Sequence, residues 1–157
     1  MDWFATNVAP RTQMKTCVVG RGFEAFRADL ERPGKVEVIG AVDSLGDWYR
    51  DAHVVIAPIF DGSGMKTKVA EALMFGKKVI GTTEAFSGYE GVAGRVGWRC
   101  ETADDFVAAL TQAQDMDLPA FDPAMRAIYD ELFSRDAARA RMAEILGMPV
   151  PEGPGPS

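Results

Sequence analysis

The sequence has few cysteines, one histidine and no long apolar run. Its two cysteines, Cys17 and Cys100, each stand in an apolar stretch that predicts a strand, so we expect buried, reduced thiols and no disulfide. The single histidine, His53, is assigned no role, and without a Cys/His cluster we expect no metal site. No run is long enough to span a membrane and no signal peptide opens the chain. These features predict a cytoplasmic protein.

Positive charge is also scarce. With 17 Lys and Arg against 23 Asp and Glu, the formal net charge is −6. A broad surface for nucleic acid or anionic membrane is therefore not expected, although the balance leaves room for a local basic pocket. The 157 residues, 47% of them hydrophobic, are enough for one domain with its own core.

Apolar runs alternate with helical patterns along the chain. This order predicts an α/β fold, a Rossmann-like parallel sheet of about five strands with helices on both faces. We expect one domain over residues 1–147 and a disordered tail rich in proline and glycine over residues 148–157. Ligands of such sheets bind at the carboxyl ends of the strands. The expected strands are 16–19, 36–39, 54–57, 79–82 and 96–100. The expected helices are 2–11, 23–31, 44–51, 65–75, 102–114, 124–133 and 134–146. We expect Phe23, Phe26 and Leu30 to share one stripe of the second helix, and Leu45, Trp48 and Tyr49 to point inward from the third.

The most informative stretch runs from the strand at 54–57 to Gly76. Pro58 ends the strand, residues 62–64 form a glycine loop, and the following helix ends at Gly76. A strand, glycine loop and helix place backbone N–H groups and a positive helix end at one spot, which suits a diphosphate. A carboxylate about 10 Å further along the same helix face can accept hydrogen bonds from a ribose. The candidate residues are Gly62, Ser63, Gly64 and Met65 for binding, with Lys66, Lys68 and Glu71 for the chemistry.

The same pattern has a plainer interpretation. Two lysines and a glutamate are also what the solvated face of a helix contains, with Glu71 paired to Lys68 one turn earlier. Spacing alone leaves both interpretations open.

Residues 54–91 resemble the C-terminal, nucleotide-sugar-binding domain of GT-B glycosyltransferases, and weaker similarity extends from Trp3 to about Leu146. The group is the large, retaining, group 1 or family 4-like set that includes bacterial lipopolysaccharide and capsule transferases. The resemblance is carried by residues 62–73 (GSGMKTKVAEAL), 76–82 (GKKVIGT) and 88–91 (GYEG).

The resemblance implies a role for each part of the site. In such enzymes the glycine loop and helix hold the donor diphosphate without a metal, and a glutamate at the place of Glu71 binds the ribose. The loop that includes Gly40 and Val42 lies beside the nucleotide base, held by main-chain groups, although Gly40 also fits an ordinary turn after a strand. Many members carry a second glutamate where this chain has Ser63, so the identity of the sugar stays open. The substrate implied is a nucleotide-diphosphate sugar, with no other cofactor.

The resemblance also implies missing parts. Relatives have a second, N-terminal domain that binds the acceptor, and they have a central strand before the helix that holds Trp3 and Phe4. A truncated or split gene, a separate N-terminal acceptor-binding subunit, or a homodimer that covers the gap would each account for this. We therefore expect the chain alone to bind nucleotide and to transfer sugar slowly or not at all. The alternatives are a non-catalytic relic of the fold that acts as an interaction domain, and a sugar epimerase or phosphorylase of similar build.

Overall fold

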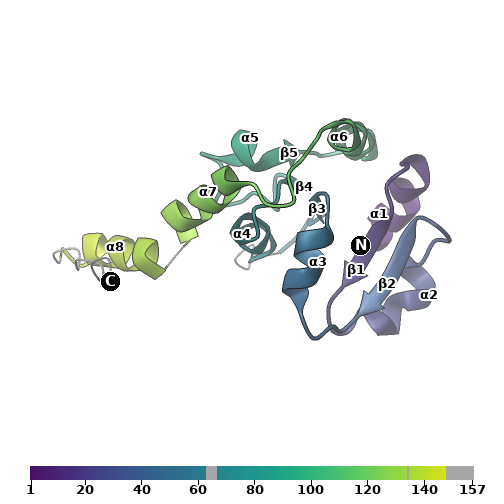
Figure 1. The fold of residues 1–157 in the computed structure, drawn as a ribbon, viewed down its shortest axis with the longest axis horizontal. Coiled ribbons are helices and arrows are strands. Elements are labelled where there is room, and N and C mark those ends of the chain that lie inside the picture. The colour runs from purple at the N-terminus through teal and green to yellow at the C-terminus, as the bar shows by residue number, and fades with distance from the viewer. Residues whose placement is uncertain (63–66, 134, 148–157) are drawn as a thin grey trace.

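The protein is an α/β chain in which helices flank parallel strands (Figure 1). The computed structural model describes residues 1–62, 67–133 and 135–147. In chain order the elements are α1 (Asp2–Asn7), the short 3-10 helix η1 (Ala9–Arg11), β1 (Thr16–Val19), the 3-10 helix η2 (Phe23–Phe26), α2 (Arg27–Leu30), β2 (Val36–Gly40), α3 (Leu45–Asp51), β3 (Val55–Ala57), α4 (Thr67–Met74), β4 (Val79–Gly81), α5 (Ala93–Val96), β5 (Gly97–Arg99), α6 (Ala103–Asp115), α7 (Pro123–Phe133) and α8 (Arg135–Ile145).

The strands form two sheets and not one. β1 pairs with β2, while β3, β4 and β5 form a second sheet in that order, and all of these pairings are parallel. The α/β class and the parallel pairing are confirmed, but the expectation of one sheet of about five strands is wrong. Five strands are described, and no described strand lies between β1 and β3, so each of these two strands is an edge.

Two hydrophobic cores lie on either side of the sheets. The first joins α1, β1 and β2 to α6 and includes Phe4, Val38 and Phe106. The second packs α4 and α7 beneath the loop that precedes β5. The neighbours Val79 and Ile80 on β4 belong to different cores, because successive side chains of a strand point to opposite faces. The first core spans both sheets, which fixes them relative to each other.

Several helix ends follow from the sequence. α6 begins with a capping box, in which Thr102 Oγ1 accepts from the Asp105 N–H and the Asp105 carboxylate accepts from the Thr102 N–H. The helix before Gly76 ends there as expected, and Gly76 has a φ of 67°. The helix expected over residues 2–11 is divided into α1 and η1, and α5 was not expected.

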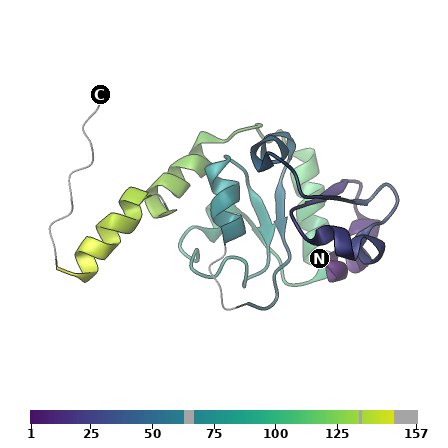
Figure 2. The ribbon, with the colours of Figure 1, turned by 90° about the horizontal axis from the view of Figure 1, so that it is seen from below.

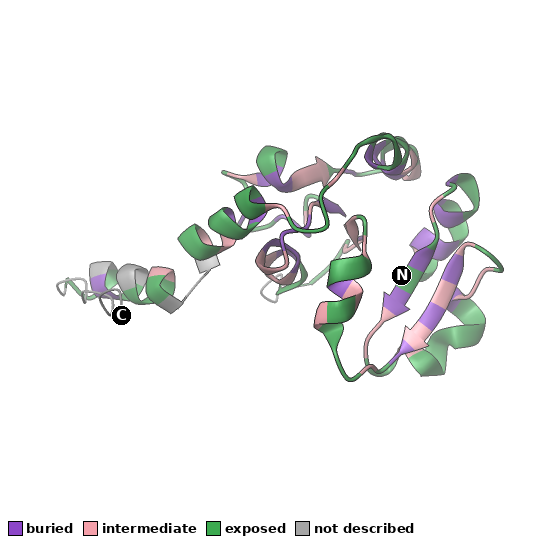
Figure 3. Cartoon of the chain, in the orientation of Figure 1, coloured by how far each residue is buried: buried purple, intermediate pink, exposed green. Residues whose placement is uncertain are grey.

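Burial corrects other expectations (Figure 3). Cys100 is buried, but Cys17 is exposed, because β1 turns that side of its sheet away from the first core. Leu30 is buried on the stripe of residues 23–30, whereas Phe26 is 56% exposed. On α3 Tyr49 is buried and Leu45 is 41% exposed. The strand β3, expected to be buried, is half-buried except at its last residue, because it is an edge strand.

The last two helices run outward from the sheets (Figures 1 and 2). α7 packs on α4, and α8 follows it with exposed apolar side chains at Met142 and Ile145. The expected tail at 148–157 lies outside the described residues. Among the helices described, none is long and apolar enough to cross a membrane.

Candidate functional site

The candidate site lies where β3 leads into α4. The strand ends at Ala57, and α4 begins at Thr67 on the other side of the connecting loop. Of the expected binding residues, Gly62 is described and exposed. Ser63, Gly64, Met65 and Lys66 lie outside the described residues.

Lys68 and Glu71 lie together on one face of α4. The Lys68 Nζ atom is 2.9 Å from Glu71 Oε2, and the two side chains are 53% and 34% exposed. Tyr49 Oη on α3 donates a second hydrogen bond of 2.9 Å to the same carboxylate oxygen. Both side-chain donors that the described residues offer to Glu71 therefore bind the same oxygen, Oε2. The lysine–glutamate pair of the plainer interpretation is therefore present.

Tyr49 was expected to point inward but was not expected in the site. Its ring stacks on Phe75, with centroids 4.7 Å apart and planes at 8°. Burial, together with the hydrogen bond to Glu71, raises the pKa of Tyr49, so the phenol stays protonated and donates. A buried tyrosine hydroxyl requires a hydrogen-bond partner, so a tyrosine expected to point inward already indicated that such a contact exists. The sequence could not identify that partner, because Glu71 is 22 residues away.

The side chain of Glu24 binds the loop that follows β2. Its carboxylate accepts the Ala41 N–H at 2.7 Å and the Gly22 N–H at 2.8 Å, and these bonds join two loops that were expected to converge. Hydrogen bonds from its own N–H and from that of Ala41 lower the pKa of Glu24. Gly40 has a φ of 83°, which favours glycine, and a Cβ there would lie 2.5 Å from Glu24 Oε1 unless the Glu24 side chain moved. Val42 is half-buried in the same loop. Sequence reasoning missed Glu24, and the main-chain donor at residue 41 is engaged by it.

The loops after β3 and β4 also meet. Thr82 Oγ1 donates to the Ile59 carbonyl, and the Thr83 N–H donates to Glu101 Oε1 at 3.1 Å. Within the expected 83–91 loop, Tyr89 is buried. The Thr82 contact brings the end of β4 against the loop that leads toward α4.

A cavity of about 390 Å³ adjoins the site. It is lined by β1, β3 and α3, and by Lys68 from α4. The lining is mainly apolar, and Lys68 is the one charged side chain among the described residues that form it. The lysine of the candidate site therefore borders a hollow between the two sheets.

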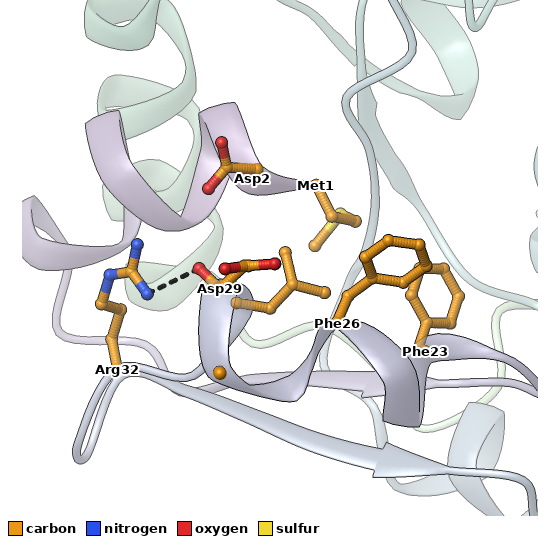
Figure 4. A pocket seen from close by; sticks show the side chains of 8 residues that line it. Met1, Asp2, Phe23, Phe26, Asp29 and Arg32 are labelled. Atoms are coloured by element: carbon orange, nitrogen blue, oxygen red, sulfur yellow. Dashed lines mark hydrogen bonds between the residues drawn. The ribbon is translucent and has the colours of Figure 1, made fainter.

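A second hollow, of about 590 Å³, lies between α1 and α2 (Figure 4). The rings of Phe23 and Phe26 stand on one side of it, and Asp2 and Asp29 stand near its other side. Arg32 Nη1 donates to the Asp29 carbonyl at 2.8 Å. With two carboxylates against the one guanidinium of Arg32, the charge of the lining is net negative, which disfavours a diphosphate.

Two further polar residues have structural partners. His53 Nε2, just before β3, lies 2.7 Å from the Ala113 carbonyl oxygen of α6. Lys77 is 2% exposed and donates to the carbonyls of Arg50 and Ala52 at the end of α3. The His53 contact joins the segment before β3 to α6, and the Lys77 contacts join the segment before β4 to the end of α3.

Comparison with known protein families gives a match over most of the chain. The sequence profile of the family described as "Glycosyl transferases group 1" matches residues 1–115, from α1 to the end of α6. No curated protein matches the chain significantly. The matched part includes the whole candidate site and excludes α7 and α8.

Proposed function

Because the chain belongs to the group 1 glycosyl transferases, we propose that its β3–α4 unit binds a nucleoside-diphosphate sugar as the donor for glycosyl transfer. The observation that carries the proposal is the carboxylate of Glu71, which Tyr49 and Lys68 hold through Oε2. Two donors limit the rotation of this carboxylate, and we propose that its other oxygen, Oε1, accepts hydrogen bonds from the ribose hydroxyls.

The proposed roles follow from charge and position. Lys68 lies in the first turn of α4, where the helix dipole also favours an anion. Lys66, outside the described residues, is proposed as a second cation at the same diphosphate. As the glycosidic bond breaks, negative charge grows on the leaving nucleoside diphosphate, and preorganised positive groups stabilise that charge. Glu71 orients the donor and takes no part as an acid or a base.

The proposal predicts nucleotide binding by the purified chain. We would titrate the chain with UDP, GDP and ADP by calorimetry, and repeat the titration with Glu71→Ala. Loss of a hydrogen bond to a charged group costs about 1.5–3 kcal/mol, so the variant should bind about 10- to 150-fold more weakly. Glu131→Ala removes an exposed glutamate from α7 and should leave binding unchanged.

One observation favours a second candidate, an interaction domain that keeps the fold without the chemistry. Glu71 is bound by two side chains of its own chain, as a structural glutamate would be. If no nucleotide binds to a chain that unfolds cooperatively, this second function is preferred and the donor site is rejected. Binding that is equal in wild type and Glu71→Ala also rejects the site as proposed.

Transfer is expected to need more than this unit. We propose that the acceptor is positioned by a separate domain or subunit, so the purified chain should bind its nucleotide and turn over slowly. Rapid transfer by the chain alone, followed as release of nucleoside diphosphate in the presence of donor and acceptor sugars, would contradict this part of the proposal.

A further inference from the structure

Lys77 is a buried lysine to which the proposed chemistry gives no part. The residue is 2% exposed, and its Nζ atom donates to the carbonyl oxygens of Arg50 at 3.0 Å and Ala52 at 2.6 Å. Removing an ammonium group from water is costly unless hydrogen bonds offset the loss, and here the two carbonyls do so. The burial of Lys77 therefore depends on the end of α3 lying where these carbonyls can reach it.

The backbone of Lys77 is held in place by the end of α4. The Gly76 N–H donates to the Leu73 carbonyl at 3.0 Å, and the Lys77 N–H donates to the Ala72 carbonyl at 2.9 Å. Because Gly76 has a φ of 67°, these two bonds form a Schellman motif, a common way for a helix to end at a glycine. The Lys77 side chain therefore extends toward α3 from a backbone that α4 fixes.

α3 has few other contacts that fix its position. It is 7 residues long, and isolated helices shorter than about 12–15 residues are marginal in water. Its N-cap, Ser44, makes no side-chain capping hydrogen bond, and Tyr49 is its one buried residue. The last carbonyls of a helix have no partner within the helix, and Lys77 binds two of them, on Arg50 and on the C-cap Ala52. The position of the end of α3 therefore depends on the Lys77 side chain.

The same two helices build the candidate site, and they lie side by side (Figures 1 and 2). Tyr49 Oη lies 2.9 Å from Glu71 Oε2, and the Tyr49 ring stacks on Phe75. Glu71 and Phe75 are four residues apart, so they share one face of the helix, and Lys77 follows them. A contact of about 3.6 Å is no longer a hydrogen bond, so a displacement of the Tyr49 hydroxyl by about 1 Å away from Glu71 breaks this bond.

We propose that Lys77 is a positioning residue of the donor site, which holds the end of α3 so that the Tyr49 hydroxyl stays bound to Glu71. This inference rests on the proposed function, because it assigns Lys77 to the nucleotide site through these two residues. Lys77 is buried and binds two carbonyls, so it acts through Tyr49 and does not contact the nucleotide. Its part therefore differs from that of Lys68, which is 53% exposed on α4.

The first test observes Tyr49 directly and needs no nucleotide. The full chain is labelled with tyrosine that carries carbon-13 at Cζ, whose NMR signal responds to the hydrogen bond of the phenol. The chain has three tyrosines, and the signal that is missing from Tyr49→Phe belongs to Tyr49. Glu71→Ala gives the reference shift for a phenol that has lost this acceptor. We expect Lys77→Met to move the Tyr49 signal in the same direction.

Two matched variants separate positioning from stability. Lys78→Met removes the neighbouring lysine, which donates to the Arg95 carbonyl at 3.2 Å, and it should leave the Tyr49 signal unchanged. Val38→Ala opens a cavity on β2 in the first core, so it should lower the urea midpoint and also leave that signal unchanged. If Lys77→Met behaves as Val38→Ala does, with a lower midpoint and an unchanged Tyr49 signal, Lys77 is merely structural and the proposal is overturned.

The second test is a double-mutant cycle in nucleotide affinity, measured by calorimetry. Lys77→Met should raise Kd by about two- to fivefold, because its effect cannot exceed that of losing the Tyr49 hydroxyl. In a chain that already carries Tyr49→Phe, the same substitution should leave Kd unchanged, because the hydroxyl through which Lys77 acts is gone. Equal fold-changes in the two backgrounds would overturn the proposal. A wild-type chain that binds no nucleotide rejects the proposed function, whereas the Tyr49 signal still shows whether Lys77 holds the contact.

A milder substitution covers the case in which Lys77→Met does not fold. Lys77→Gln keeps N–H donors in a side chain that is one atom shorter, so it cannot keep both carbonyl contacts unless α3 moves. We expect this variant to unfold cooperatively in urea and to show the same direction of shift at Tyr49. A wild-type Tyr49 signal in Lys77→Gln, together with wild-type affinity for the nucleotide, would overturn the proposal.

Discussion

Removal of one hydroxyl tests whether Glu71 is held for a ligand. Tyr49→Phe deletes the Oη–H that donates to Glu71 Oε2 and keeps the ring that stacks on Phe75. The Lys68 bond to the same oxygen remains. The carboxylate then has one fixed donor in place of two, and it can rotate about its pair with lysine. We expect the variant to fold as the wild type does and to bind nucleotide more weakly.

The size of the effect follows from the exposure of the pair. A hydrogen bond to a charged group contributes about 1.5–3 kcal/mol when water cannot replace it. Glu71 is 34% exposed, so water can take part of the place of the phenol. We therefore expect about 1 kcal/mol in binding free energy, which is about a fivefold rise in Kd. This is smaller than the loss expected for Glu71→Ala, because Tyr49 acts through the glutamate.

The assay is calorimetric titration with the nucleotide that binds best to wild type. Phe75→Leu is the matched variant, because it removes the stacking ring and keeps the Tyr49 hydroxyl. If the hydroxyl positions Glu71, Tyr49→Phe weakens binding more than Phe75→Leu does, although it perturbs packing less. Wild-type affinity in Tyr49→Phe, together with lost affinity in Glu71→Ala, would refute the positioning role. Equal losses of nucleotide affinity in Tyr49→Phe and Phe75→Leu would show that Tyr49 acts through packing alone.

Three further predictions concern stability. Lys77→Met should lower the free energy of unfolding in urea by about 1–3 kcal/mol, because two carbonyls at the end of α3 lose their donor, while Lys78→Met at a more exposed site should change it little. Gly97→Ala should lower the free energy of unfolding by at least about 3 kcal/mol or prevent folding, because a Cβ there would lie 1.7 Å from a carbonyl oxygen of β4. At Gly94 an added Cβ meets no atom within 4 Å, so Gly94→Ala should leave the melting temperature nearly unchanged. Backbone N–H groups at the start of α6 lower the pKa of Asp105 from its usual 3.8, so its stabilising effect is present above that pH and is lost as the pH falls through the lowered value. Asp105→Asn should therefore show a flatter loss of melting temperature below about pH 4 than wild type shows, and an unchanged acid slope would contradict the assignment.

Local signals in the sequence predicted most elements correctly. The strand at 16–19 is found with the bounds expected, because an apolar run between a polar segment and a glycine turn determines it locally. α6 begins at its threonine cap and the helix before Gly76 ends at a left-handed glycine, and both of these signals act within one turn of the chain. Such features depend on residues that are close in sequence, so the sequence alone predicts them.

Features that depend on distant contacts were predicted poorly. Apolar content alone predicted buried positions for Cys17 and Phe26, which are exposed, because burial depends on what packs against the element and not on its composition. The division into two sheets could not be predicted from strand patterns, since these give the number of strands and not their neighbours. In the candidate site, the shared face of Lys68 and Glu71 was predictable from helical spacing, whereas the contacts of Tyr49 and Glu24 cross from one element to another.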